Sequence, residues 1–218
     1  MKRLTSIVAM DHHGAIGAGN SIPWRLRTDM RFFRQATMGK VVIMGRKTFE
    51  SLGRKPLAGR FNIVLSHNMG FFIDSPEARV VHSVGEALEV AWKASAGGQC
   101  FVVGGATIYE QFAPYVDQYL ISLVDKVVVD ADTYFDVGLF SAGNWDIAQH
   151  CNVPASDADE VGFTVFELKP DDADAIAELR EARIEAHQEE TNRRGLARAI
   201  AGLRRSTHAQ AARTAAML

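Results

Sequence analysis

Cysteine is scarce in this chain, which has only Cys100 and Cys151 among its 218 residues. Two cysteines so far apart fit neither a metal-binding spacing nor a disulfide framework, a usage typical of a reducing compartment. No apolar run is long enough to span a membrane, and the short run after Lys2 and Arg3 is too polar for a signal peptide. The sequence therefore predicts a cytoplasmic protein without a membrane segment.

A strong charge of one sign is also missing, because 24 basic and 26 acidic residues leave a formal net charge of −2. This balance argues against bulk attraction of the whole protein to nucleic acid or to membranes. The chain has no glycine fingerprint of the GxGxxG type, no P-loop and no Ser/His/Asp arrangement. The adjacent His12 and His13 lack the spacing of metal ligands, so we expect no metal.

What the chain does have is a regular alternation of short apolar runs and helical patterns over residues 1–169. The runs that predict strands are Thr5–Met10, Val41–Met44, Phe61–Leu65, Arg79–His82, Cys100–Val103, Tyr119–Val124, Trp145–Cys151 and Val161–Leu168. The patterns that predict helices are Arg27–Thr37, Lys47–Leu52, Val84–Ala94 and Ile108–Phe112. Strands separated by helices indicate an α/β fold with a largely parallel sheet. The turn-rich residues 154–159 join the last two strands and predict a hairpin at one edge of the sheet.

The composition changes at Pro170, which divides the chain into a domain of residues 1–169 and an extension of residues 170–218. Residues 171–190 contain eight acids and two arginines, a balance of −6, whereas residues 191–218 contain six arginines and no acids, a balance of +6. Both parts are rich in alanine and have apolar residues at helical spacing, so we expect a helical tail. Three interpretations stay open: a solvated or partly disordered tail, a helical hairpin that pairs the two charged parts, and a segment that contacts a partner or nucleic acid.

The segment from Ile22 to Met30 places a single carboxylate, Asp29, at the start of a predicted helix among apolar neighbours. Trp24 lies shortly before it. A carboxylate in apolar surroundings loses hydration, and hydrogen bonds usually compensate that loss. A flat heterocycle with amino groups would supply them, so the segment predicts a pocket for a pterin-like compound. The preceding glycine-rich residues 14–21 form a candidate mobile lid.

Two junctions between a strand, a glycine and a helix are candidates for binding phosphate. The first is residues 45–48 (Gly-Arg-Lys-Thr), and the second is residues 104–106 (Gly-Gly-Ala). Free N–H groups at a helix start attract anions, and paired glycines let a ligand approach the backbone. For each junction alone, an ordinary turn is the alternative. Two junctions in one sheet could hold a pyrophosphate between them, which indicates a dinucleotide.

Three further side chains leave alternatives open. Arg60 stands directly before a predicted strand, where a fixed arginine suits bidentate binding of a carboxylate. A solvated side chain is the commoner state of an arginine in that position. His67 and His82 follow neighbouring strands, where they could meet an additional phosphate or be merely exposed.

Taken in order, these segments resemble the dihydrofolate reductase family over about residues 4–168. The resemblance is carried by Ile22-Pro23-Trp24, Asp29, the Met44–Gly53 run, Pro56–Arg60 and Gly104-Gly105-Ala106 with Tyr109-Glu110. It implies an eight-stranded, mainly parallel central sheet flanked by helices. It also implies NADPH-dependent reduction of dihydrofolate to tetrahydrofolate by a monomeric body.

The resemblance implies roles for particular residues. Asp29 would bind the amino group and adjacent N–H of the pterin, and Trp24 would position the water that delivers a proton to the ring nitrogen. Arg60 would bind the α-carboxylate of the glutamate tail. Ser122 would stand in place of the threonine that usually supports the acid. The other residues implied for the substrate cleft are Ile7, Ala9, Met30, Phe33, Leu52, Leu57 and Val103.

A second set of residues is implied for the cofactor. One group would lie at the nicotinamide end, and another, which includes Arg46 and His67, would hold the 2′-phosphate. The charges of this second group are the reason to favour NADPH over NADH. The implied cofactor residues are Ala9, Ile16, Gly17, Gly45, Arg46, Lys47, Thr48, Leu65, Ser66, His67, Val103, Gly104, Gly105, Ala106, Thr107, Ile108 and Tyr109.

Two other functions fit parts of the sequence. A related reductase of the same fold acts on a pyrimidine intermediate of riboflavin synthesis, but Trp24, Asp29 and Arg60 favour a folate. A non-catalytic module would use the domain as a scaffold and the charged tail for contacts, but the complete set of site residues argues against lost activity. Residues 131–136 lack the glycine and proline that commonly flank their Asp-Thr pair in the family, which bears on loop coupling and not on the chemistry.

Overall fold

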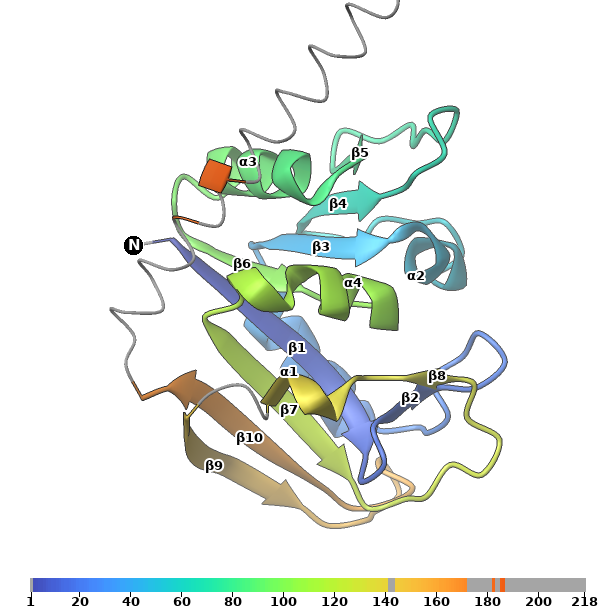
Figure 1. The fold of residues 1–218 in the computed structure, drawn as a ribbon. Coiled ribbons are helices and arrows are strands. Elements are labelled where there is room, and N and C mark those ends of the chain that lie inside the picture. Colours follow the sequence, from blue (N-terminus) through green and yellow to red (C-terminus); the bar gives the residue numbers. More distant parts are fainter. Residues whose placement is uncertain (1, 141–143, 172–181, 183–184, 187–218) are drawn as a thin grey trace, which may run out of the picture.

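The protein is built on one eight-stranded sheet (Figure 1), seen in a computed structural model that describes residues 2–140, 144–171, 182, 185 and 186. Its strands are β1 (Arg3–Asp11), β3 (Val41–Gly45), β4 (Phe61–Leu65), β5 (Ala78–Val81), β6 (Gln99–Val102), β7 (Gln118–Val124), β9 (Trp145–Val153) and β10 (Phe163–Pro170). Their order in the sheet is β5-β4-β3-β6-β1-β7-β10-β9. β10 is antiparallel to β7 and β9, and the other neighbours are parallel. The predicted mainly parallel sheet with an edge hairpin is confirmed.

Helices cover both faces of this sheet (Figure 1). The helices are α1 (Arg27–Thr37), α2 (Arg46–Ser51), α3 (Val84–Ala94) and α4 (Ala106–Phe112), with short 3-10 turns at Ala113–Tyr115 and Val137–Phe140. Leu88 of α3 and Ile108 of α4 join one apolar cluster, whereas Phe33 of α1 and Phe49 of α2 join a second one. Successive side chains of a strand point to opposite faces. α1 and α2 therefore share the face on which Asp29 lies.

A second, two-stranded sheet was not predicted. β2 (Ala15–Gly17) pairs with β8 (Thr133–Tyr134) in antiparallel fashion, beyond the carboxyl end of β1 (Figure 1). Strands this short leave no alternating pattern in a sequence, and the glycines of residues 14–21 favour a loop. The predicted tail lies outside the described residues from residue 172 on, apart from Ala182, Glu185 and Ala186, which are helical.

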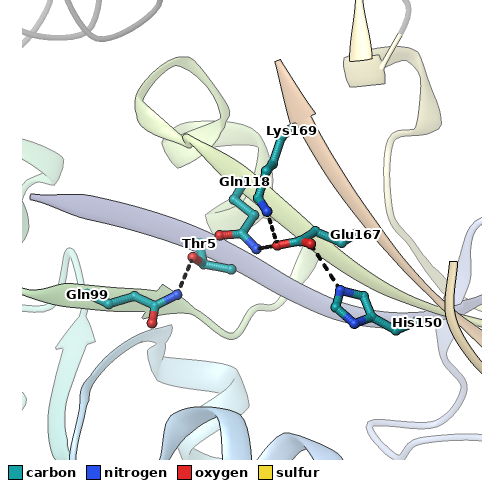
Figure 2. Close-up of polar contacts among 6 residues, drawn as sticks. All are labelled: Thr5, Gln99, Gln118, His150, Glu167 and Lys169. Atoms are coloured by element: carbon teal, nitrogen blue, oxygen red, sulfur yellow. Dashed lines mark hydrogen bonds and ion pairs between the residues drawn. The ribbon is translucent and has the colours of Figure 1, made fainter. Parts of the chain in front are cut away.

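A polar cluster joins the edge hairpin to β7 (Figure 2). The Glu167 carboxylate accepts hydrogen bonds from Gln118, from Lys169 at 2.9 Å and from His150 at 3.0 Å. Burial opposes ionisation of Glu167, but Lys169 and His150 outweigh it and hold the pKa of Glu167 below its usual range. Gln118 precedes Ser122 by four residues on β7, so both side chains lie on the same face. The cluster thus fixes the strand that carries Ser122.

Candidate active site

Asp29 lies in the first turn of α1, where the sequence predicts a helix with the same bounds. The residue is 9% exposed, so its carboxylate is largely removed from water. The position before the helix is Leu26, whose side chain gives α1 no cap of its own. Leu26 and Trp24 are instead buried in an apolar cluster with β7 and β10. The start of α1 is therefore held by packing, and this packing fixes where Asp29 points.

Ser122 of β7 contacts the acid directly. Its hydroxyl donates a hydrogen bond of 2.5 Å to Oδ1 of Asp29. Burial raises the pKa of Asp29, the bond from Ser122 opposes this effect, and the negative charge of Asp159 adds to it. The site thus holds an acid that takes up a proton more readily than an exposed aspartate does.

The residues predicted for the substrate cleft divide into packed and exposed groups. Ile7, Phe33, Leu57 and Val103 belong to one apolar cluster on the face covered by α1 and α2. Ala9 packs against the separate cluster that contains Trp24. The predicted residues that stay exposed are Met30 at 54% and Leu52 at 40%. Two exposed apolar side chains beside a packed cluster suit an apolar ligand surface.

Arg60 is more fixed than an ordinary surface arginine. Its guanidinium donates to Thr37 Oγ1 at 3.1 Å and to the Ala58 carbonyl at 3.3 Å. It also lies over the ring of Phe33, 5.9 Å from the ring centre. Burial and the neighbouring Arg34 lower the pKa of Arg60. The half-buried, oriented side chain favours carboxylate binding over the solvated alternative.

The two glycine junctions meet, as the sequence predicts. β3 and β6 are neighbours, and the Gly45 N–H donates to the Gly104 carbonyl at 2.8 Å. A methyl group on Gly45 would come within 2.9 Å of Ile108, and one on Gly105 within 3.3 Å of Thr48. A side chain at Gly45 would force Ile108 to move, and one at Gly105 would crowd Thr48, so the two glycines let the helix starts lie this close. The peptide bond between Gly104 and Gly105 is cis.

The charged residues near the first junction are partly engaged. Arg46 donates to both carboxylate oxygens of Glu50 at 2.8 Å, so its charge is shared with a neighbour one helical turn away. Ser66 is buried and His67 is exposed, directly after Leu65 at the end of β4. His82 is held by Ser66, whose carbonyl lies 2.8 Å from Nδ1. Lys47 is exposed, and Ala106 and Thr107 lie in the first turn of α4.

Tyr109 links the second junction to the Asp29 pocket. Its hydroxyl donates to the Ile7 carbonyl at 2.8 Å, and its ring lies where a methyl group on Gly104 would come within 3.0 Å. Burial and the charge of Asp29 raise the pKa of Tyr109 well above its usual range. Ile7 and Ala9 both lie on β1, and Ala9 pairs with Ser122 of β7. β1 therefore connects Tyr109 of the second glycine junction to the Asp29 pocket.

The glycine-rich residues 14–21, the predicted lid, are tied to the chain at both ends. Asp11 accepts hydrogen bonds from the backbone of His13 and Ala15, both at 2.8 Å, and from Val128 at 3.0 Å. Asp132 accepts from the Gly19 N–H at 2.8 Å. Ile16 and Gly17, predicted to meet the nicotinamide, lie in β2 within this segment. The hydrogen bond from Gly19 to Asp132 thus joins residues 14–21 to residues 131–136.

One cavity of the described chain lies elsewhere. Its volume is about 450 Å³, and residues 39–41, 59–61 and 98–99 at the amino ends of β3, β4 and β6 contribute to its wall. Gly45 is the last residue of β3 and Gly104 comes shortly after β6, so both lie at the opposite, carboxyl ends of these strands. Arg60 is the predicted site residue that this cavity includes. It therefore does not mark the Asp29 pocket.

Sequence reasoning missed Asp159, which approaches Asp29 from a turn 130 residues later along the chain. It also missed the hydrogen bond from Tyr109 to Ile7 and the anchoring role of Asp11. Each of these contacts joins residues far apart in sequence, and no local pattern marks them. The local sequence of a polar turn is the same whether its acid is buried or solvated, so it does not reveal that Asp159 is buried.

Together these features describe an α/β enzyme with a buried carboxylate and two neighbouring helix starts that follow glycines. A sequence model of the family described as dihydrofolate reductase matches residues 3–169. The chain belongs to the dihydrofolate reductase family.

Individual relatives agree with this assignment. The dihydrofolate reductase of Neisseria gonorrhoeae is 41% identical over 136 residues, which are 62% of this chain and 80% of that protein. Dihydrofolate reductase type 3 of Salmonella typhimurium is 36% identical over 154 residues, 71% of this chain and 90% of that protein. A solved dihydrofolate reductase from Enterococcus faecalis, complexed with NADP(H) and RAB-propyl, has a TM-score of 0.66 and 26% identity. That likeness covers 78% of this chain and 97% of the other.

Proposed function

We propose that this chain catalyses the NADPH-dependent reduction of dihydrofolate to tetrahydrofolate. The observation that carries the proposal is the buried Asp29 carboxylate, 9% exposed and bonded through Oδ1 to Ser122. No described residue donates a hydrogen bond to Oδ2, so this oxygen is free to accept one from a ligand. A buried acid with an open acceptor matches a planar ring that presents N–H groups.

The activity is assigned to residues 1–169, and residues 170–218 are assigned to an extension. The family match ends at residue 169, and β10 ends at the buried Pro170. The change in composition at the same point supports this division.

Asp29 and Trp24 are the proposed catalytic residues. Asp29 would accept hydrogen bonds from the amino group and the adjacent N–H of the pterin. Trp24 would position a water at the ring nitrogen that receives a proton. Arg60, already oriented by Thr37, would bind the α-carboxylate of the glutamate tail. The remaining substrate contacts are assigned to Ile7, Ala9, Met30, Phe33, Leu52, Leu57, Val103 and Ser122.

The glycine junctions fit the phosphates of the cofactor. Because Gly45, Gly104 and Gly105 have no side chains, backbone N–H groups of two helix starts are open to an anion at one place. NADPH, when bound, supplies the hydride. The proposed contacts are Ala9, Ile16 and Gly17 at the nicotinamide end, Tyr109 near that ring, residues 45–48 and 103–108 at the phosphates, and Leu65, Ser66 and His67 toward the 2′-phosphate.

The chain contributes charge, orientation and exclusion of water. An ionised Asp29 stabilises positive charge on a protonated ring, because an opposite charge close by favours the cation. Ser122 holds Oδ1, so the carboxylate presents Oδ2 in one direction. The apolar cluster of Ile7, Phe33 and Leu57 keeps water away, which strengthens this charge interaction. Alignment of the nicotinamide and pterin rings then lowers the free-energy barrier to hydride transfer, because the entropy of bringing the two rings together is lost on binding and not in the reaction step.

The test is a spectrophotometric assay of NADPH oxidation by the purified full chain with and without dihydrofolate. We expect oxidation that depends on dihydrofolate and on NADPH, and much slower turnover with NADH. In a parallel reaction, the pyrimidine intermediate of riboflavin synthesis replaces dihydrofolate. Turnover of the pyrimidine in preference to dihydrofolate would contradict the proposal.

We further propose a cytoplasmic enzyme whose body is monomeric and whose tail contacts a partner or nucleic acid through its basic part. The described residues include two free cysteines, which is typical of a reducing compartment. No described helix is long and apolar enough to cross a membrane. The six arginines without acids in residues 191–218 support the proposed contact. Sedimentation of the full chain with and without a short duplex DNA tests the monomeric state and the contact with nucleic acid.

A further inference from the structure

The turn between β9 and β10 is fixed by its own hydrogen bonds. Ser156 and Asp159 exchange backbone N–H to carbonyl hydrogen bonds of 2.8 and 3.1 Å. The Ser156 hydroxyl also accepts from the N–H groups of Ala158 and Asp159 at 3.2 Å. A turn this closely bonded holds the Asp159 side chain in one direction.

That direction is toward the start of α1. Asp159 is 1% exposed, and its Oδ1 accepts from the Thr28 N–H at 2.8 Å. The first turn of a helix leaves N–H groups without partners, and a carboxylate is among the best caps for them. Since Leu26 gives α1 no cap, the cap comes from a segment 131 residues away.

Backbone and ion-pair contacts join the same turn to the residues before α1. The Arg27 N–H donates to the Ala158 carbonyl at 3.1 Å, and the Glu160 N–H donates to the Arg25 carbonyl at 3.2 Å. Lys126 donates to the Pro23 carbonyl at 2.7 Å and to Glu160 at 2.8 Å. These contacts lie on both sides of Trp24 and reach the residue directly before Asp29, so they hold the segment that carries the two proposed catalytic residues.

We infer that Asp159 is a positioning residue for the reduction: through the Thr28 N–H, one residue before Asp29, it caps the helix that carries Asp29 and brings a second negative charge to the start of that helix. This inference rests on the proposed function. It gives the β9–β10 turn a part in the reaction although the turn touches neither ring.

The charge of Asp159 is present at neutral pH. Burial opposes its ionisation, but hydrogen bonds from Thr28 and Ser156 and the charge of Arg31 hold the pKa of Asp159 below its usual range. Burial is the main cause of the raised pKa of Asp29, and the charge of Asp159 adds to it. The groups that interact with these two acids are Thr28 and Arg31 of α1, Ser156 of the turn, Ser122 of β7 and Tyr109 of α4. Lys126 and Glu160 pair with each other, and Asp157 is exposed.

Proton uptake in the pocket should respond to this charge. A negative charge near Asp29 favours a proton on Asp29 or on the bound ring. The rate of hydride transfer falls as pH rises, and this charge moves the midpoint of the fall to a higher pH. In a variant without the charge, the midpoint should therefore lie at a lower pH. We expect a shift of about half a pH unit, hence about threefold slower transfer above the midpoint.

The experiment measures the pH profile of single-turnover hydride transfer in three full-length variants. Asp159→Asn keeps an oxygen for the Thr28 N–H and removes the charge, so the midpoint should fall with little change in melting temperature. Asp159→Ala removes both, so the same shift should come with a melting temperature lower by about 3 °C. Asp157→Asn is the matched control: it removes a charge from an exposed residue of the same turn, and its profile should equal that of the unaltered chain.

An unchanged midpoint in Asp159→Asn, or an equal shift in Asp157→Asn, would overturn the inference. A second measurement does not depend on turnover: carbon-13 NMR of the Asp29 carboxyl in the free protein. Its pKa should be lower in Asp159→Asn than in the unaltered chain and unchanged in Asp157→Asn. If the chain failed to reduce dihydrofolate, the proposed function would fail, and this NMR comparison would still decide whether Asp159 acts on Asp29.

Discussion

The two parts of the site are built from different materials. The carboxylate part (Trp24, Asp29 and Ser122) consists of side chains held by contacts between distant segments. The glycine part (residues 45–48 and 104–106) consists of backbone brought close by missing side chains. A side-chain site is sensitive to a change of charge or hydrogen bonding at constant volume. A backbone site is sensitive to a single added methyl group.

Asp29→Asn is the largest expected effect and separates the two parts. The amide keeps the volume and removes the charge that stabilises a protonated ring, so turnover at neutral pH should fall by about 10²- to 10³-fold. The dissociation constant of NADPH, measured by fluorescence titration, should stay within about twofold because the glycine part is intact. Turnover equal to that of the unaltered chain would reject the role of Asp29.

Gly104→Ala should affect the other part. Gly104 has a φ of +105°, and a methyl group there would meet the Tyr109 ring at 3.0 Å. Crowding and backbone strain together should weaken NADPH binding about tenfold or more. The matched control is Gly97→Ala, at a φ of +76° with no atom within 4 Å of the added methyl group. It shares the strain without the crowding, so it should lower the melting temperature and leave NADPH binding unchanged. Equal binding in both variants would contradict the proposed phosphate site.

The pKa of Asp29 also makes a prediction about stability. Because the pKa is raised in the folded protein, the contribution of this group to stability is fully present below its unfolded pKa of about 3.9 and is lost as pH rises through the folded pKa. Asp29→Asn without ligands should therefore unfold with a free energy about 1 kcal/mol higher than the unaltered chain at pH 7. Urea unfolding of both proteins at pH 7 and at a pH below about 3.9 measures this difference. A gain of equal size at low pH would show that the charge is not its cause.

Removal of the tail should have the smallest effect. A chain that stops after Asp171 keeps the buried Pro170 and the hydrogen bond from the Asp171 N–H to the Asn144 carbonyl at 3.2 Å. We expect kcat/KM within about twofold and a melting temperature within about 2 °C of the full chain. A tenfold loss of kcat/KM would show that the extension supports the catalytic domain.

The same comparison explains which parts of the molecule the sequence could predict. The bounds of α1 and α3 agree with the helical patterns because apolar spacing is local, and the Ser83 cap of α3 is local as well. The glycine junctions were identified for the same reason. Ser122 came only from the family resemblance, since its hydroxyl meets Asp29 across 93 residues. Asp159 and the β2–β8 pair were missed because each depends on where a distant loop lies.

Single-turnover hydride transfer from NADPH to dihydrofolate, followed across pH in the unaltered chain and in Asp29→Asn, tests the central claim most directly. For the unaltered chain, we expect a rate that declines as pH rises, because the pocket must hold a proton. For Asp29→Asn with NADPH bound, we expect a rate at least about 100-fold lower at neutral pH. Equal rates in the two proteins at every pH would contradict the claim that the buried carboxylate binds and polarises the ring.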